Sequence, residues 1–382
     1  MFKILKGGTV LSPEDLGRKD LLIAGNVVAN ITDGINPSPE YGDIEVIDVQ
    51  GKYVVPGFVD QHEHIIGGGG EAGYASRTPE AGLSHIIMSG ITTVVGCLGT
   101  DGTTRHMEAL LAKARGLENE GISTYIYTGS YEVPTRTITG GVRKDMILID
   151  KVVGCGEIAM SDHRSAQPSK EDISKLAAEV RVGGILSGKA GVLHLHIGDG
   201  KRKLKMLFDI LEETEIPITQ FTPTHINRNP SLLEDGIKFA KMGGMIDMTS
   251  SISNVKASQA IRYCLDKGVS IDNITMSSDG NGSMPSFDEK GQIRGLAVAG
   301  PDSLYKEFRD LLKEGLSIQD ALKVITTNPA KSLKLWPAKG SLGIGSDADI
   351  VVLDNDLNIE YVFAKGKCMV EKGIPIVKGM FE

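Results

Sequence analysis

Two histidines separated by one residue follow a β-branched run early in the chain and could together bind a metal ion. Residues 59–64 have the sequence VDQHEH, with the pair at His62 and His64. Because the side chains of a strand alternate between its two faces, both imidazoles would point the same way. Neighbouring imidazoles can chelate a divalent cation, but an isolated pair more often faces solvent. The pair therefore indicates a metal site only if further ligands gather beside it.

Further candidate ligands stand at the ends of later β-rich runs, and with His62 and His64 five of the eight histidines fall at or near such ends. These later candidates are Glu157, His194, His196, His225 and Asp279. Imidazole and carboxylate form a ligand set that suits Zn, Mn, Co or Fe in the divalent state. His194 and His196 share a face, so spacing leaves open which of them is the ligand. Asp279 could bind a metal, transfer a proton or cap the next helix.

The elements that must position these residues follow a β–α rhythm through the middle of the chain. Eight strands are expected at Tyr53–Asp60, Thr92–Gly96, Thr124–Thr128, Val152–Ile158, Val192–Ile197, Ile218–Thr224, Met245–Thr249 and Ile274–Asp279. This α/β pattern predicts a (β/α)₈ TIM barrel, which typically has about 250 residues. An open doubly wound sheet is the alternative. In the barrel the active site lies at the carboxyl ends of the strands, so the candidate ligands would meet there.

Short β-rich pieces separated by turn residues occupy both ends of the chain. They precede Pro56 and return after about Gly340. We therefore expect a small discontinuous β-sandwich domain built from residues 1–55 and 340–382. The metal-dependent barrel would then span residues 56–339.

The composition argues against nucleic acids and membranes as binding partners. The 382 residues are 41% hydrophobic and carry a net charge of -8, the wrong sign for a surface that collects nucleic-acid or membrane phosphates. No uncharged apolar run has the length of a signal peptide or a membrane span, which predicts a cytoplasmic protein. The four cysteines form no C-x-x-C pair and are expected to be reduced and buried.

Several motifs resemble the amidohydrolase superfamily over essentially the whole chain. They are VPGFVDQHEH at 55–64, TNPA at 327–330 and GSDADIVV at 345–352. A second set resembles the isoaspartyl dipeptidases within that superfamily. This set is GGGGEAG at 67–73, YEVPTRTITG at 131–140, SDHRS at 161–165, PTHINRN at 223–229 and SSDGNGS at 277–283. Five motifs in the matching order are far more specific than the histidine pair alone.

The resemblance implies a centre of two divalent metal ions, with zinc as the default. It assigns one ion to His62, His64 and Asp279, and the other to His196 and His225. It thus favours His196 over His194. The bridging position falls at Glu157, where the commonest family pattern has a carboxylated lysine. Glutamate has a shorter stem, so the two ions would lie differently.

The reaction implied by the resemblance is hydrolysis of the β-aspartyl amide bond in isoaspartyl dipeptides. A hydroxide bridging the metals would attack the amide carbonyl, since metal ions lower the pKa of water to about 7 in favourable sites. Asp279 would act as general base and then as general acid, and Tyr131 would stabilise the oxyanion. The expected substrate-binding residues are Glu71 for the ammonium, Arg164 and Arg228 for carboxylates, and Ser283, Thr100 and the Gly69 amide for neutral hydrogen bonds.

Two other functions stay open beside this one. Another amidohydrolase reaction, either cyclic amide hydrolysis or deamination, would keep the metals and change the charges that line the pocket. The second is a catalytically silent oligomeric scaffold, which would need no metal ligands. The chain retains five of them, at His62, His64, His196, His225 and Asp279. The resemblance also implies a homo-oligomer, with an octamer among the assemblies it allows.

Overall fold

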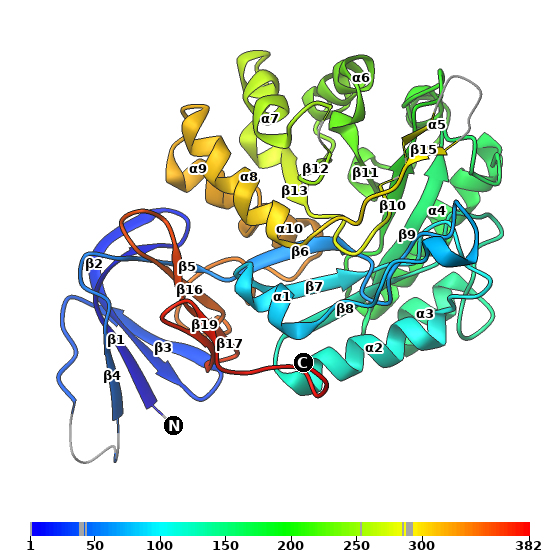
Figure 1. Ribbon diagram of the computed structural model, residues 1–382. Coiled ribbons are helices and arrows are strands. Elements are labelled where there is room, and N and C mark those ends of the chain that lie inside the picture. Colours follow the sequence, from blue (N-terminus) through cyan, green and yellow to red (C-terminus); the bar gives the residue numbers. More distant parts are fainter. Residues whose placement is uncertain (1, 38–41, 43, 253, 285, 288–292) are drawn as a thin grey trace.

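The computed structural model describes residues 2–37, 42, 44–252, 254–284, 286–287 and 293–382. Two sheets of different construction organise these residues. One is a curled parallel sheet covered by helices, and the other is a mixed sheet made from both ends of the chain (Figure 1). The candidate ligands belong to the first.

The curled sheet contains six parallel strands in sequence order. They are β6 (Phe58–Glu63), β7 (Ile91–Gly96), β8 (Ser123–Thr128), β9 (Val152–Met160), β10 (Val192–Ile197) and β11 (Phe221–Thr224). Strands β12 (Ile246–Thr249) and β13 (Ile274–Ser277) form a separate parallel pair. The backbone N–H of His64 donates to the carbonyl of Gly280 at 2.8 Å, so the segment after β13 runs beside the end of β6.

Helices separate the strands and cover the sheet. They are α1 (Leu83–Met88), α2 (Met107–Glu120), α3 (Val142–Leu148), α4 (Lys170–Ser187), α5 (Lys205–Glu213), α6 (Pro230–Lys241), α7 (Ala257–Asp266), α8 (Asp302–Lys313), α9 (Ile318–Lys323) and α10 (Thr327–Ser332). Helix α4 shows how the sequence sets their limits. Ser169 and Asp172 form a capping box at its start, and Gly188 ends it in the left-handed conformation at φ 71°.

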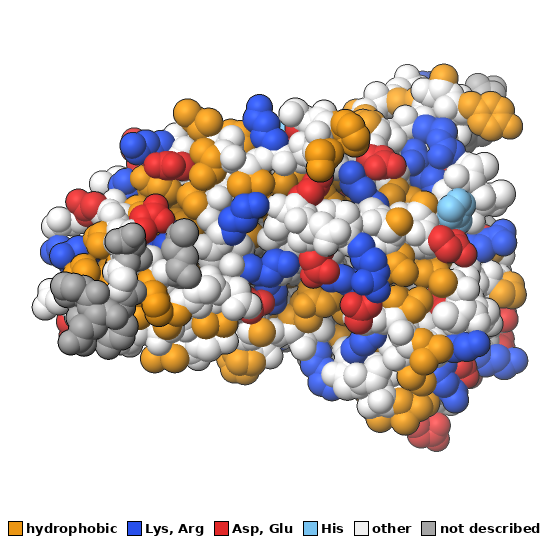
Figure 2. Space-filling view, turned by 90° about the horizontal axis from the view of Figure 1, so that it is seen from below, with side chains coloured by type: hydrophobic (Ala, Val, Ile, Leu, Met, Phe, Trp, Pro, Cys, Tyr) orange, Lys and Arg blue, Asp and Glu red, His pale blue; other side chains and the backbone are white. Residues whose placement is uncertain are grey.

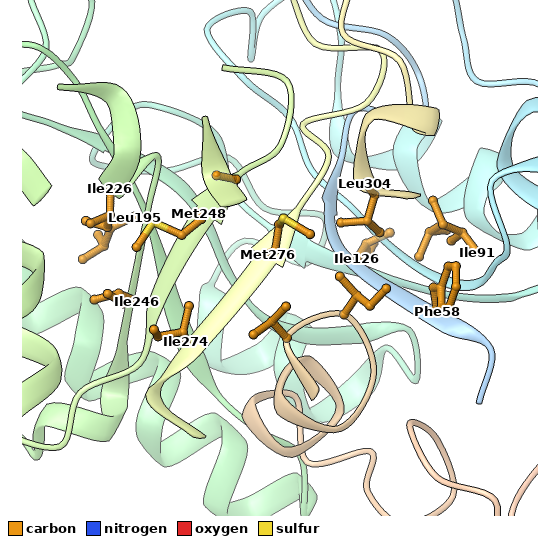
Figure 3. Close-up of a cluster of buried hydrophobic side chains, with 14 of the residues drawn as sticks. Phe58, Ile91, Ile126, Leu195, Ile226, Ile246, Met248, Ile274, Met276 and Leu304 are labelled. Carbon is orange, nitrogen blue, oxygen red and sulfur yellow. The ribbon is translucent and has the colours of Figure 1, made fainter. Parts of the chain in front are cut away.

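The main apolar core lies between these strands and helices. Figure 3 shows Leu195 of β10, Met248 of β12 and Met276 of β13 among its buried side chains. Phe58 of β6 packs against Phe308 of α8 with ring centroids 6.0 Å apart. Almost every residue of the curled sheet is buried, as expected where helices cover parallel strands. The strand ends are therefore held rigidly.

The second sheet has nine strands, and both chain ends contribute to it, as the sequence predicts. Its strands are β1 (Phe2–Leu11), β2 (Asp15–Ala24), β3 (Val27–Thr32), β4 (Ile44–Asp48), β5 (Tyr53–Pro56), β16 (Ile350–Leu353), β17 (Ile359–Ala364), β18 (Lys367–Glu371) and β19 (Ile374–Pro375). The antiparallel pairing of β5 with β16 joins the two ends. Strands β14 (Ser286–Phe287) and β15 (Ile293–Gly295) form a separate two-stranded antiparallel sheet.

Two predicted strand boundaries are wrong. The run Tyr53–Asp60 is two strands, because β5 belongs to the terminal sheet and β6 to the curled sheet. Gly57 separates them where the backbone passes Thr92, since a Cβ at Gly57 would lie 2.2 Å from the Thr92 hydroxyl oxygen. The run Ile218–Thr224 begins with a 3₁₀ turn, η3 (Ile218–Gln220), and only then becomes β11.

One face of the molecule carries charged side chains of both signs (Figure 2). Figure 2 shows a face on which Lys and Arg side chains are interspersed with Asp and Glu. Among the helices in the described ranges, none has both the length and the apolar character needed to cross a membrane.

Candidate active site

The predicted metal ligands converge at the carboxyl ends of the parallel strands. His62 lies in β6 with His64 just after it, Glu157 lies in β9 and His196 in β10. His225 follows β11 and Asp279 follows β13, both with a positive φ. Because parallel strands place these ends at one edge, residues up to 217 positions apart in sequence become neighbours.

Glu157 stands at the centre of the group, with only 1% of its surface exposed. Its Oε1 lies 3.4 Å from His64 Nε2. Its Oε2 lies 3.0 Å from His196 Nδ1 and 3.5 Å from both His62 Nε2 and His225 Nε2. One carboxylate thus contacts four imidazoles, which is the arrangement expected of a group that bridges two cations.

Two overlapping sets of donor atoms surround Glu157. One contains His62, His64 and Cys97, the other His196 and His225, and within each set the atoms lie within 4.8 Å of one another. Asp279 adds a carboxylate to the first set, with Oδ1 3.1 Å from His64 Nε2 and 3.5 Å from His62 Nε2.

The charges of this site suit a divalent metal. Burial would raise the pKa of Glu157, but His62 and His196 outweigh it and hold that pKa well below its ordinary value. Burial would raise the pKa of Asp279, but a hydrogen bond to His64 and the charges of the neighbouring histidines lower it to about 2.

The imidazole nitrogens also fit metal ions. Burial, assisted by the charge of His196, lowers the pKa of His225 to about 3, so its imidazole is neutral and keeps a lone pair. The Nε2 of His62 is buried without a hydrogen-bond partner among the described residues, although it faces both carboxylates. Anionic carboxylates that face imidazole nitrogens at these distances are the donor set of a transition-metal centre.

Buried polar residues hold the ligands in place. Asp60 Oδ1 accepts the backbone N–H groups of His62 and Ser278, each at 3.2 Å, and so ties the end of β6 to the segment that carries Asp279. The Nδ1 of His225 lies 2.7 Å from the Thr249 hydroxyl, which directs its Nε2 toward Glu157. Sequence reasoning assigned neither Asp60 nor Thr249 to the site.

Two further residues, Cys97 and His194, contact the candidate ligands in ways that the sequence did not predict. Cys97, predicted only to be buried, has its Sγ 3.9 Å from His64 Nδ1. Spacing alone could not decide whether His194 or His196 is the ligand. In the structure His194 lies outside both donor sets, and its Nε2 is 2.8 Å from His62 Nδ1. Both contacts join segments that are separate in sequence, so no local pattern predicts them.

Tyr131 lies beside the second donor set. Its hydroxyl is 2.8 Å from His196 Nδ1, and only 6% of the residue is exposed. Burial and the charge of Glu157 raise the pKa of Tyr131 well above its ordinary value, although Arg164 opposes them. The hydroxyl therefore keeps its proton and can donate it in a hydrogen bond.

Predicted substrate-binding residues form a connected polar group next to Tyr131. The Nη1 of Arg164 lies 3.2 Å from Glu71 Oε1. The other Glu71 oxygen accepts from the Ser283 hydroxyl at 2.9 Å, and Thr100 contacts Oε1 at 3.3 Å. Gly69 has φ 77°, and a Cβ there would lie 2.5 Å from the carbonyl oxygen of Ser76, so glycine is required.

Asp162 is a member of this group that sequence reasoning missed. It accepts from Arg164 Nε at 3.0 Å and from Arg164 Nη2 at 2.8 Å. Its Oδ2 also lies 3.1 Å from His196 Nε2. Burial would raise the pKa of Asp162, but hydrogen bonds to His196 and Arg164 lower it far below its ordinary value. Asp162 thus links a metal-ligand candidate to a substrate-binding candidate.

Arg228 ends the 3₁₀ turn η4 (Ile226–Arg228), which follows His225. Its Nε donates to the carbonyl of Ile197 at 3.0 Å, which holds the guanidinium at the end of β10. Its charge also acts on Tyr131 and His225. Arg228 therefore lies on the rim of the same site.

Comparisons with known proteins agree with this geometry. Residues 53–374 match the family model described as the amidohydrolase family. This chain is similar to β-aspartyl dipeptidase from Fervidobacterium islandicum AW-1, whose crystal structure contains the β-Asp-Leu dipeptide. The two sequences are 46% identical. The match covers 98% of each chain with a TM-score of 0.93.

Curated relatives are more distant. Dihydroorotase of Staphylococcus aureus (strain MRSA252) is 38% identical over 111 residues, which are 28% of this chain and a quarter, 25%, of that enzyme's length. L-hydantoinase of Paenarthrobacter aurescens is 22% identical over 93% of this chain and 86% of its own.

Proposed function

Because the chain belongs to the amidohydrolase family, we propose that it is a metal-dependent β-aspartyl dipeptidase that hydrolyses isoaspartyl dipeptides. One observation carries this function: the likeness to the Fervidobacterium β-aspartyl dipeptidase extends over 98% of the chain at 46% identity. The buried histidines and carboxylates at the strand ends supply the metal site that such a hydrolase needs.

Two divalent ions, by default zinc, would occupy the two donor sets. His62, His64 and Asp279 would hold one ion, His196 and His225 the other, and Glu157 would bridge them. When bound, the ions would polarise the amide carbonyl and make water acidic enough to serve as a nucleophile near neutral pH.

Asp279 and Tyr131 would move and stabilise the reacting charges. The ionised carboxylate of Asp279 would accept a proton from the attacking water and deliver it to the departing amine nitrogen. The Tyr131 hydroxyl keeps its proton and would donate a hydrogen bond to the carbonyl oxygen as negative charge develops there.

The polar group beside the metal site would recognise the dipeptide. An isoaspartyl dipeptide carries one ammonium and two carboxylates around its amide. Glu71 would bind the ammonium, while Arg164 and Arg228 would bind carboxylates through two parallel hydrogen bonds each. Neutral hydrogen bonds would come from Ser283, Thr100 and the Gly69 amide.

The test is an assay of purified enzyme on β-Asp-Leu, with and without added zinc. Cleavage of β-Asp-Leu that depends on zinc, with no cleavage of α-Asp-Leu, is the expected result. Cyclic amides such as a dihydropyrimidine or a hydantoin are included as competing substrates. Faster turnover of a cyclic amide would replace the dipeptidase function with cyclic amide hydrolysis. Absence of all these activities would favour the silent scaffold.

We also propose the finer architecture. The contact of Glu63 with Gly280 supports closure of the eight parallel strands into a (β/α)₈ barrel over residues 56–339. Strand β1 pairs with both β4 and β5, which supports folding of the terminal sheet into a β-sandwich over residues 1–55 and 340–382. Assembly into a homo-oligomer is tested by light scattering coupled to gel filtration.

A further inference from the structure

His194 is a fully buried histidine that the proposed reaction does not use. It lies on β10 two positions before His196, and its Nε2 is 2.8 Å from the Nδ1 of His62. We propose that His194 is a positioning residue, which accepts a hydrogen bond from His62 Nδ1–H and so leaves His62 Nε2 free to bind a metal. This inference rests on the proposed function, in which His62 is a metal ligand.

The two nitrogens of His62 face opposite environments. Its Nε2 points to Glu157 and Asp279, each at 3.5 Å, whereas its Nδ1 contacts His194. A neutral imidazole carries one N–H, so a hydrogen on Nδ1 leaves a lone pair on Nε2. The opposite tautomer would place the hydrogen on Nε2, between the ring and the carboxylates, and would block metal binding there.

The surroundings of His194 make it a rigid partner. Its ring stacks on Tyr127, with centroids 4.8 Å apart and planes 13° from parallel. A Cβ at Gly156 would lie 2.7 Å from the Cβ of His194, so the glycine before Glu157 makes room for this side chain. The Nδ1 of His194 has no hydrogen-bond partner among the described residues, which leaves Nε2 as its engaged nitrogen.

The imidazole of His194 can orient His62 without adding charge to the metal site. Metal-binding histidines usually donate their second N–H to a carboxylate, a backbone carbonyl or water. The first donor set already contains the carboxylates of Glu157 and Asp279. A neutral imidazole fixes the orientation of His62 without adding a third negative charge to a buried site, where unpaired charge is costly.

Metal affinity in two variants tests the role of His194 without substrate. Zinc dissociation constants are measured by chelator competition for the wild type, His194→Leu and His194→Gln. Loss of a hydrogen-bonding partner of this kind typically costs about 10–100-fold in metal affinity, which we expect for one of the two ions in His194→Leu. His194→Gln should recover part of that loss, because its amide oxygen can accept from Nδ1–H. Tyr127→Phe is the matched control, since it keeps the stacked ring and should bind both ions normally.

A second measurement needs no variant. In ¹⁵N spectra of histidine-labelled, zinc-loaded wild type, His62 should be protonated at Nδ1 and coupled through the hydrogen bond to His194 Nε2. A proton on His62 Nε2, or full affinity for both ions in His194→Leu, would overturn the role of His194. If His194→Leu does not fold, the glutamine variant and these spectra decide. Failure of the wild type to cleave β-Asp-Leu would refute the proposed function alone, because neither measurement uses substrate.

Discussion

The two halves of the candidate metal centre are supported in different ways. In the first half, His194 contacts His62 from outside the donor set, and Cys97, a member of that set, contacts His64. Neither of these belongs to the polar group proposed to bind substrate. In the second half, His196 contacts Tyr131 directly, and it contacts Asp162.

The first half of the centre is therefore expected to contribute to metal binding alone, and the second half to both metal binding and substrate recognition. Asp162 is also bound to Arg164, which in turn contacts Glu71. A dipeptide that engages Arg164 would therefore act on His196 through one shared carboxylate. We expect changes behind the first half to alter metal affinity alone, and changes behind the second half to alter substrate recognition as well.

Removal of the group common to both halves should have the largest effect. In Glu157→Ala the four imidazoles lose their shared carboxylate, and breaking a buried ionic group typically costs about 3–5 kcal/mol. We expect kcat/KM to fall by at least about 10³-fold, equivalent to about 4 kcal/mol, and the metal content to fall below two ions per subunit. Metal analysis and steady-state kinetics check this. Glu179→Ala, on the exposed face of α4, is the control. Retention of two ions would show that Glu157 is not a bridge.

Asp162→Asn should have the next largest effect and tests the link in the second half. The amide keeps the shape of the side chain but loses the charge shared by Arg164 and His196. We expect kcat/KM to fall about 10²-fold, near 3 kcal/mol, with weaker binding of one ion and a higher KM. Asp209→Asn, which affects an exposed pair on α5, should change nothing. A loss of metal affinity with an unchanged KM would remove the distinction between the two halves.

Arg228→Lys should affect recognition and leave the metals in place. A lysine keeps the positive charge but cannot form two parallel hydrogen bonds with a carboxylate. We expect kcat/KM to fall by at least about tenfold, near 1.4 kcal/mol, at full metal content. Kinetics with β-Asp-Leu and metal analysis of the same sample check this. An unaltered kcat/KM would place Arg228 outside the substrate pocket.

The positions of the candidate ligands were predictable because they follow from local rules. The alternation of strand side chains places His62 and His64 on one face, and the β–α rhythm brings strand ends to one edge. In the structure Glu157 and Asp279 lie beside these two histidines, and His196 contacts Glu157.

The supporting contacts were not predictable, because each depends on which strands become neighbours in space. His194 reaches His62 from β10 to β6, and Cys97 reaches His64 from the segment after β7. Spacing within one strand cannot reveal such pairs. The strand boundary at Gly57 was missed for the same reason, since the close approach of Thr92 sets it.

Cys97→Ala should have the smallest effect and tests whether the thiol in the first half binds the metal. The Sγ of Cys97 lies 3.9 Å from His64 Nδ1, on the ring nitrogen that faces away from Asp279. A thiol is a weak hydrogen-bond donor, so its removal should cost about 0.5 kcal/mol, or about twofold in metal affinity. Cys264→Ala, in the buried face of α7, controls for loss of a buried thiol elsewhere. A loss of tenfold or more in chelator competition would instead identify Cys97 as a metal ligand, and the first half would then hold its ion through a thiolate.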